Sequence, residues 1–184
     1  MRGTMKKRIA CILLAAMTLT FAACGNKTGD LASDNGNAAA GSTEEAEASG
    51  NLEGSCAGIL DEIYQTAKTE DDFFSYTSDY ENVEITDDNE EYILGTTDID
   101  FTDSIYSAPM MSSIAYQCVV LRVSENQDVE AAKQLLKDNA DPGKWVCVEA
   151  ESVVVENVGD VILFIMADND VAEAAKEAFL ALEK

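Results

Sequence analysis

The chain has 184 residues and no histidine, and its 35 acidic residues against 12 basic ones give a formal net charge of −23. A charge of this sign repels nucleic acid and anionic membrane surfaces, so we expect no nucleic-acid partner and no membrane binding through a basic patch. Without histidine the chain lacks the commonest general base and the commonest zinc ligand. We therefore expect no enzyme of that kind, no metal site and no cofactor.

Residues 1–23 have the pattern of a secretory signal peptide. A basic start over 1–8 precedes an uncharged apolar stretch over 9–23. That stretch is shorter than the about 20 residues that a transmembrane helix needs. We expect a leader that is removed rather than a membrane span.

The next residues resemble the lipobox of bacterial lipoproteins. Small residues, Ala22 and Ala23, precede Cys24, and Gly25 follows it, while Phe21 stands where the family most often has Leu. The resemblance implies cleavage between Ala23 and Cys24 by lipoprotein-processing enzymes, and a diacylglycerol on the Cys24 thiol. Two acyl chains suffice for stable anchoring at about 0.8 kcal/mol per buried methylene. We expect a lipid-anchored protein on the extracytoplasmic face of the cell membrane. The alternative is an ordinary signal peptide with a chance cysteine.

Residues 24–54 are expected to form a disordered acidic tether. They are rich in Gly, Ala, Ser, Asn, Asp and Glu and hold no aromatic side chain, so they cannot build a core. A tether of this kind reaches roughly 30 Å. It would lift a single domain, residues 55–184, off the membrane.

The domain opens with a predicted helix over 55–68. Cys56, Ile59 and Ile63 share one face of this helix, and Ser55 suits its N-cap. No cation stands near Cys56 in the sequence to activate its thiol. We expect Cys56 to be a small buried apolar group.

Aromatic residues gather in 71–80. Phe73, Phe74 and Tyr76 lie in this stretch, and Trp145 is the only tryptophan of the chain. These four residues are the candidate binding surface, an aromatic platform for a sugar or a peptide. The alternative, which the large burial energy of aromatic side chains favours, is that they cover the end of the core.

Two short elements are predicted next, a capped helix over 86–95 and an edge strand over 104–108. Between them, Asp98 to Asp103 invites a calcium reading. The run lacks the glycine at the sixth position of an EF-hand loop and its final glutamate. A solvated acidic loop is therefore favoured. Met110 and Met111, which follow the edge strand, are expected to fill gaps between packed side chains.

The C-terminal half alternates strands and helices. Apolar periodicity predicts strands over 114–123, 145–155 and 161–166, and helices over 128–139 and 171–182. These elements predict an α+β fold. Its small, mostly antiparallel sheet of three to four strands has a strand-helix-strand-strand-helix (split βαβ, ferredoxin-like) arrangement, preceded by an N-terminal helix.

The expected strand order is 104–108, 114–123, 161–166, 145–155, because 161–166 is apolar on both faces and belongs at the sheet centre. Both later helices are expected on one face, with the N-terminal helix and the aromatic segment on the other. In this order Cys118 and Cys147 lie at least about 9–10 Å apart. A disulfide needs Cα atoms within about 7 Å, so we expect free thiols.

Four short motifs follow one another along the chain: the leader with Cys24, Pro109-Met110-Met111-Ser112, Lys144-Trp145 and Asn157-Val158-Gly159-Asp160-Val161. In this order and spacing they resemble a group of Gram-positive bacterial lipoproteins that share a C-terminal domain of unknown function. The resemblance covers roughly residues 55–184. It implies a location and a domain boundary, and it carries no catalytic residues.

These observations favour a membrane-anchored, extracytoplasmic binding or adaptor module. Its partner would be an unknown envelope protein, a peptide or a glycan. The alternative is an envelope hydrolase that uses paired carboxylates, as glycosidases do. A third hypothesis is an acidic surface that binds cations, for which diffuse screening is expected and no specific site is indicated.

Overall fold

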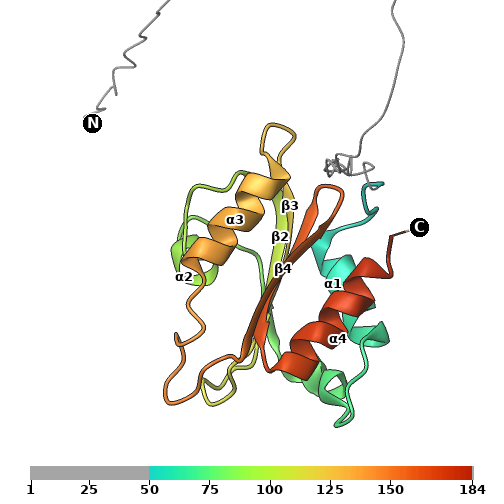
Figure 1. The fold of residues 1–184 in the computed structure, drawn as a ribbon, viewed down its shortest axis with the longest axis vertical. Coiled ribbons are helices and arrows are strands. Elements are labelled where there is room, and N and C mark those ends of the chain that lie inside the picture. The colour runs from blue at the N-terminus through green and yellow to red at the C-terminus, as the bar shows by residue number, and fades with distance from the viewer. Residues whose placement is uncertain (1–49, 184) are drawn as a thin grey trace, which may run out of the picture. The chain divides into compact units, whose positions relative to one another are not determined.

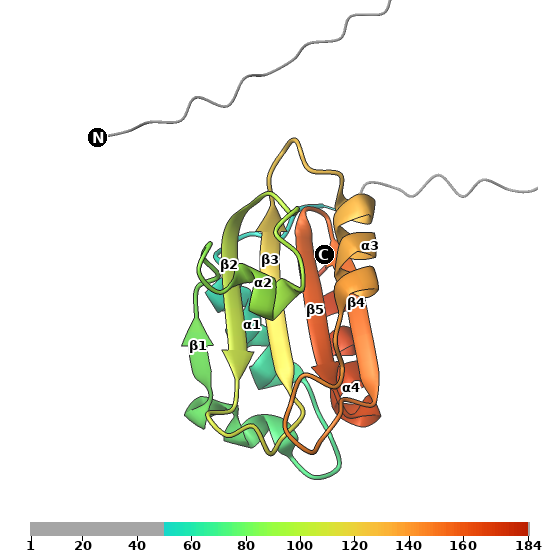
Figure 2. The same cartoon turned by 90° about the vertical axis from the view of Figure 1, so that its left-hand side faces the viewer.

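The computed structural model describes residues 50–183, which belong to one compact unit. The fold is α+β, with one open antiparallel sheet of five strands in the order β1-β2-β3-β5-β4 (Figure 2). The strands are β1 (Glu81–Val83), β2 (Phe101–Ala108), β3 (Gln117–Val123), β4 (Ser152–Val158) and β5 (Val161–Ala167). The helices are α1 (Cys56–Thr66), the 3-10 helix η1 (Phe73–Asp79), α2 (Glu90–Leu94), α3 (Val129–Asn139) and α4 (Asn169–Leu180).

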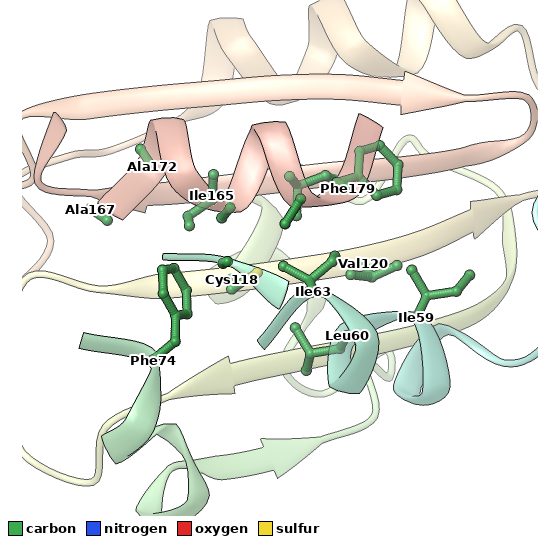
Figure 3. Close-up of a cluster of buried hydrophobic side chains, with 14 of the residues drawn as sticks. Ile59, Leu60, Ile63, Phe74, Cys118, Val120, Ile165, Ala167, Ala172 and Phe179 are labelled. Atoms are coloured by element: carbon green, nitrogen blue, oxygen red, sulfur yellow. The ribbon is translucent and has the colours of Figure 1, made fainter. Parts of the chain in front are cut away.

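Each face of the sheet carries its own hydrophobic core, so the fold has three layers (Figure 1). On one face, Cys118 and Val120 of β3 and Ile165 of β5 pack against α1, η1 and α4 (Figure 3). On the other face, Val119 of β3 and Phe164 of β5 pack against α2 and α3. Successive side chains of a strand point to opposite faces, which is why β3 and β5, with apolar side chains on both faces, supply both cores.

The strand order predicted from the sequence is confirmed for β2, β3, β5 and β4. A fifth strand, β1, pairs with β2 at the edge and was not predicted. The strand expected over 145–155 is wrong for most of its length, since β4 begins at Ser152. Cys147 has φ 68°, a left-handed conformation that an extended strand cannot contain.

The expected placement of both later helices on one face is also wrong. The side chains of α4 join the core that contains α1, whereas Ala132 and Leu136 of α3 join the opposite core. Figure 1 shows the two helices on either side of the sheet. A ferredoxin-like arrangement would cover one face with both of them, so the observed placement differs from it.

The predicted ends of two helices are confirmed by their caps. The Ser55 hydroxyl accepts a hydrogen bond from the Gly58 N–H at 3.2 Å at the start of α1. Gly95 ends α2 with φ 75°, a conformation in which glycine meets no steric penalty. These local signals located the start of α1 and the end of α2, whereas α2 begins at Glu90 rather than near residue 86. Neither signal predicts which face of the sheet a helix covers.

All three cysteines of the described domain are free, as expected from the strand order. Cys56 and Cys118 are buried, and Cys147 is exposed. Burial raises the pKa of the Cys118 thiol to about 12. For Cys56, burial and the nearby Asp103 carboxylate raise the pKa to about 12. Both buried thiols are therefore neutral, unreactive members of the core.

The first described residues are held at one end of the sheet. Arg122, near the end of β3, donates to Asp160 Oδ1 at 2.7 Å and to the carbonyl oxygens of Leu52 at 2.9 Å and Gly54 at 3.0 Å. Leu52 also packs against the core beside α1. In the described part of the chain, no helix is both long enough and apolar enough to span a membrane.

Candidate functional site

A groove opens at the end of the sheet opposite to residues 51–54. It lies where β2 ends and β3 begins. Figure 2 shows the loop between these two strands at the lower end of the sheet. Its volume is about 360 Å³. We call it the distal groove. The η1 segment contributes Phe73, Tyr76, Asp79 and Tyr80, and the loop between β2 and β3 contributes Pro109, Met110, Met111 and Ile114.

Several apolar side chains around the distal groove are exposed. Met110 is 82 % exposed, and Met111 and Tyr76 are each 65 % exposed. Soluble domains rarely leave neighbouring apolar side chains uncovered without a binding purpose. Methionine adds an unbranched, polarisable side chain that adapts to partners of different shape. The distal groove therefore has the composition of a surface that receives an apolar group.

The floor of the distal groove is a packed set of aromatic rings. The Phe73 ring lies 5.4 Å from the ring of Phe74, 5.2 Å from that of Tyr116 and 6.2 Å from that of Tyr80. Aromatic pairs at these separations stabilise the fold by more than the burial of their surface alone. The hydroxyl of Tyr116, one of these rings, also shares a hydrogen bond of 2.9 Å with the hydroxyl of Tyr64. These contacts hold the aromatic floor together, and the exposed Met110 and Met111 line the same groove.

A second depression adjoins the first, and we call it the side pocket. It shares Phe73 and Ile114 with the distal groove and has a volume of about 390 Å³. Glu149, from the loop before β4, and Asp168, at the start of α4, bring carboxylates to it. Although Asp168 is an exposed residue, partial desolvation raises its pKa, with further contributions from the carboxylates of Glu151 and Asp170.

The candidate residues from the sequence are divided by the structure. Phe73 lines both depressions and Tyr76 lines the distal groove, whereas Phe74 is buried in the core beneath them. Trp145 is half-buried and packs against the other core, on the far face of the sheet. The four residues therefore do not form one surface.

Lys144, beside Trp145, belongs to a polar cluster of a different kind. Its Nζ donates to Gln117 Oε1 at 2.6 Å and to the Tyr92 carbonyl oxygen at 2.9 Å, and lies 4.2 Å from the centre of the Tyr92 ring. Desolvation lowers the pKa of Lys144 to about 8. Its donors are already engaged, so the cluster fastens the loop before β4 to α2 and β3. We assign it a structural role.

The acidic stretch from Asp98 to Asp103 is dispersed by the fold. Asp103 Oδ2 accepts from the Cys56 N–H at 2.7 Å, and Ile99 between the acids is buried. Across residues 50–183, no group of three or more acidic or cysteine side chains is placed to hold a metal ion.

The sequence did not single out Met110, Met111 and Ile114 as site residues. The expectation that the two methionines fill gaps is wrong, since both are largely exposed. Residue type favours burial for Met, and only the fold shows that no segment within residues 50–183 covers the loop after β2. The one available signal was the placement of two large apolar residues directly after a strand-ending proline.

Comparison of the chain with protein-family models, with curated proteins and with solved structures finds no match.

Proposed function

We propose that this protein is a membrane-anchored, extracytoplasmic lipoprotein whose domain binds an envelope partner through the distal groove. The observation that carries the binding proposal is the exposed apolar rim of Met110, Met111 and Tyr76 over a packed aromatic floor. The proposed partner is an envelope protein, a peptide or a glycan. Proposed kinship with the Gram-positive lipoproteins named above rests on the motif order alone.

The proposed anchor is diacylglycerol on Cys24, after cleavage between Ala23 and Cys24. Both residues lie outside the described part of the chain, and support comes from the leader and the lipobox-like sequence. The test is the intact mass of the membrane-fraction protein from a Gram-positive host, beside Cys24→Ala. We expect a chain that begins at Cys24 and carries a diacylglyceryl group. An unmodified, secreted chain would remove the anchor from the proposal.

The position of the distal groove suits an anchored binding module. Residue 51 lies beside the turn between β4 and β5, where Asn51 Oδ1 accepts from the Asp160 N–H at 3.2 Å. The distal groove lies at the other end of β3, a seven-residue strand, or roughly 20 Å away along the sheet. A chain that enters from the membrane at residue 51 therefore meets the domain at the end that does not bind.

Site-specific photo-cross-linking in the intact envelope tests the binding proposal. A photoreactive side chain at Met111 is compared with one at Val146, which is 70 % exposed but lies outside the distal groove. We expect a discrete adduct from position 111 only, and its loss when Ile114→Ser is added. Identical adducts from both positions, or an adduct that Ile114→Ser leaves unchanged, would contradict the distal groove as the binding site.

The alternative function is an envelope hydrolase with paired carboxylates. The observation that favours it is the presence of Glu149 and Asp168 in one pocket, with the pKa of Asp168 raised. A general acid needs a raised pKa near the working pH. Against it, both residues are exposed to solvent rather than enclosed. Release of reducing ends from cell-wall glycan, abolished by Glu149→Gln, would favour the hydrolase over the binding module.

A further inference from the structure

The charged side chains around the distal groove and the side pocket all have the same sign. Asp79 lines the distal groove, and Glu149 and Asp168 line the side pocket. Within residues 50–183, no lysine or arginine lines either depression. The basic residues of this part of the chain lie elsewhere: Lys68, Arg122, Lys133, Lys137, Lys144 and Lys176.

A few carboxylates of the described residues form ion pairs, whereas these three, like most acids of the domain, do not. Asp160 pairs with Arg122 at 2.7 Å, and Glu173 pairs with Lys176 at 2.6 Å. Of the ion pairs found among the described residues, none involves Asp79, Glu149 or Asp168. At Asp168 the neighbouring acids Glu151 and Asp170 add to the local negative charge, and partial desolvation and these acids raise its pKa. A positive group brought to this rim would relieve that repulsion.

The carboxylates of Asp79, Glu149 and Asp168 lie beside a surface that is largely apolar. The distal groove offers the side chains of Phe73, Met110 and Ile114, and its only charged lining residue is Asp79. A glycan needs several directed hydrogen-bond partners, and the side chains that can supply them in this lining are those of Tyr76, Asp79 and Tyr80, beside a larger apolar surface. Anionic lipid and anionic envelope polymers are repelled by a chain of net charge −23. A polypeptide with apolar and cationic side chains meets both features at once.

We propose that the distal groove and the side pocket together bind a cationic amphipathic segment of a partner protein. An apolar side chain of the segment enters the distal groove between η1 and the methionine loop. Lysine or arginine side chains beside it approach Asp79 on one side and Glu149 and Asp168 on the other. The two depressions share the lining residues Phe73 and Ile114 and are therefore adjacent, so one short segment can reach both. This inference rests on the proposed binding function and adds the chemistry of the partner.

The test uses the mature chain, residues 24–184 with Cys24→Ala, and short fluorescein-labelled peptides. All peptides carry Leu and Trp on one face, and the polar positions are Lys, Ser or Glu in three otherwise identical versions. Fluorescence anisotropy at several salt concentrations gives the affinities. We expect the Lys peptide to bind tightest, with an affinity that falls as salt rises.

Matched charge variants separate a local effect from the overall charge. The groove set is Asp79→Asn with Glu149→Gln and Asp168→Asn. The control set is Asp61→Asn with Asp88→Asn and Glu125→Gln, three exposed acids that line neither depression. Both sets remove three negative charges. We expect the groove set to weaken Lys-peptide binding roughly tenfold, from three partly exposed charge contacts, and the control set by less than about twofold. Equal losses would overturn the inference.

An apolar variant, Met110→Ser with Ile114→Ser, distinguishes failure of this inference from failure of the proposed function. If the Ser and Glu peptides bind as tightly as the Lys peptide and this variant abolishes all three, the distal groove binds apolar segments but the cationic preference is wrong. If the variant changes no binding, both proposals are wrong. Binding of a neutral oligosaccharide that this variant abolishes, without binding of any peptide, would replace the polypeptide partner by a glycan.

Discussion

The two ends of the sheet differ in how many of their side chains have partners within the described domain. At the end near residue 51, the Arg122 guanidinium is shared by Asp160 and two backbone carbonyls. At the opposite end, Met110 and Met111 are exposed and the nearby carboxylates lack ion pairs among the described residues. The same short domain thus has one closed end and one open end. Closure indicates a structural role, whereas the exposed apolar and acidic side chains mark the end to which we assign the proposed binding site.

The largest expected effect is on the pH dependence of stability, and it tests whether the residues under the distal groove are shielded from water. Burial raises the pKa of Cys118 to about 12 and holds the pKa of Tyr64 and of Tyr116 well above 10.0. The unfolded chain loses these protons from about pH 9 to 10, whereas the folded chain keeps them, so stability falls as pH rises. Above the pKa that a group has in the unfolded chain and below its pKa in the folded chain, each group lowers the free energy of unfolding by about 1.4 kcal/mol per pH unit.

Urea denaturation at pH values from 7 to 11, followed by tryptophan fluorescence, measures this loss. We expect a plateau below about pH 8.5 and a fall of several kcal/mol by pH 11, given these three linked groups. Tyr116→Phe removes one of the titrating groups and should make the alkaline slope shallower. A free energy of unfolding that stays constant up to pH 11 would show that water reaches the floor of the distal groove.

The next effect tests the closed end. Arg122→Met removes three hydrogen bonds and leaves the Asp160 carboxylate without its cation. We expect a loss of about 2–4 kcal/mol in the free energy of unfolding, because a partly buried charge loses its partner. Lys137→Met, at an exposed position of α3, is the control and should cost less than about 0.5 kcal/mol. Equal effects of the two variants would mean that the contacts of Arg122 contribute little.

Much of this closed framework was predictable from the sequence, and the reasons are local. Val161–Ala167 is apolar throughout, which placed β5 at the sheet centre, and Gly159-Asp160 marked the hairpin before it. The face taken by each helix was not predictable in the same way. Because β3 and β5 are apolar on both faces, an amphipathic helix such as α3 finds a suitable surface on either side.

The open end was predictable only in part. The aromatic stretch 71–80 is visible in the sequence, and it does supply Phe73 and Tyr76 to the distal groove. Trp145 packs on the other face, within residues 145–151, which do not form the predicted strand. Exposure of Met110 arises because no other segment of the described domain covers the loop after β2, and residue type does not predict this.

A smaller effect on stability tests whether Lys144, which lies at the open end with its donors engaged, has a structural role. The pKa of Lys144 falls to about 8 in the folded chain from an ordinary 10.5 because of desolvation. Between about pH 8 and 10.5 the folded state binds fewer protons than the unfolded state, so this residue adds stability as pH rises.

The difference in free energy of unfolding between the unaltered chain and Lys144→Met isolates this contribution, since the other titrating groups cancel. We expect the difference to shift in favour of the unaltered chain by about 1 kcal/mol from pH 7.5 to 10, after discounting for the half-exposed position. Peptide binding to the distal groove should be unchanged in Lys144→Met at pH 7.5. A large loss of binding would place Lys144 in the site.

The smallest expected effect on stability is at the rim itself. Met110→Ala removes a side chain that is 82 % exposed, whereas Met166→Ala removes one that is 1 % exposed in the core on the α3 face. The chemical change is the same, so the difference reports the surroundings. We expect less than about 0.5 kcal/mol for Met110→Ala and about 2–5 kcal/mol for Met166→Ala in urea denaturation. A Met110→Ala cost near that of Met166→Ala would mean that the loop after β2 packs against the domain, which would close the distal groove. A negligible cost, together with loss of peptide binding, would identify Met110 as a residue kept for a partner, because it contributes nothing to the fold.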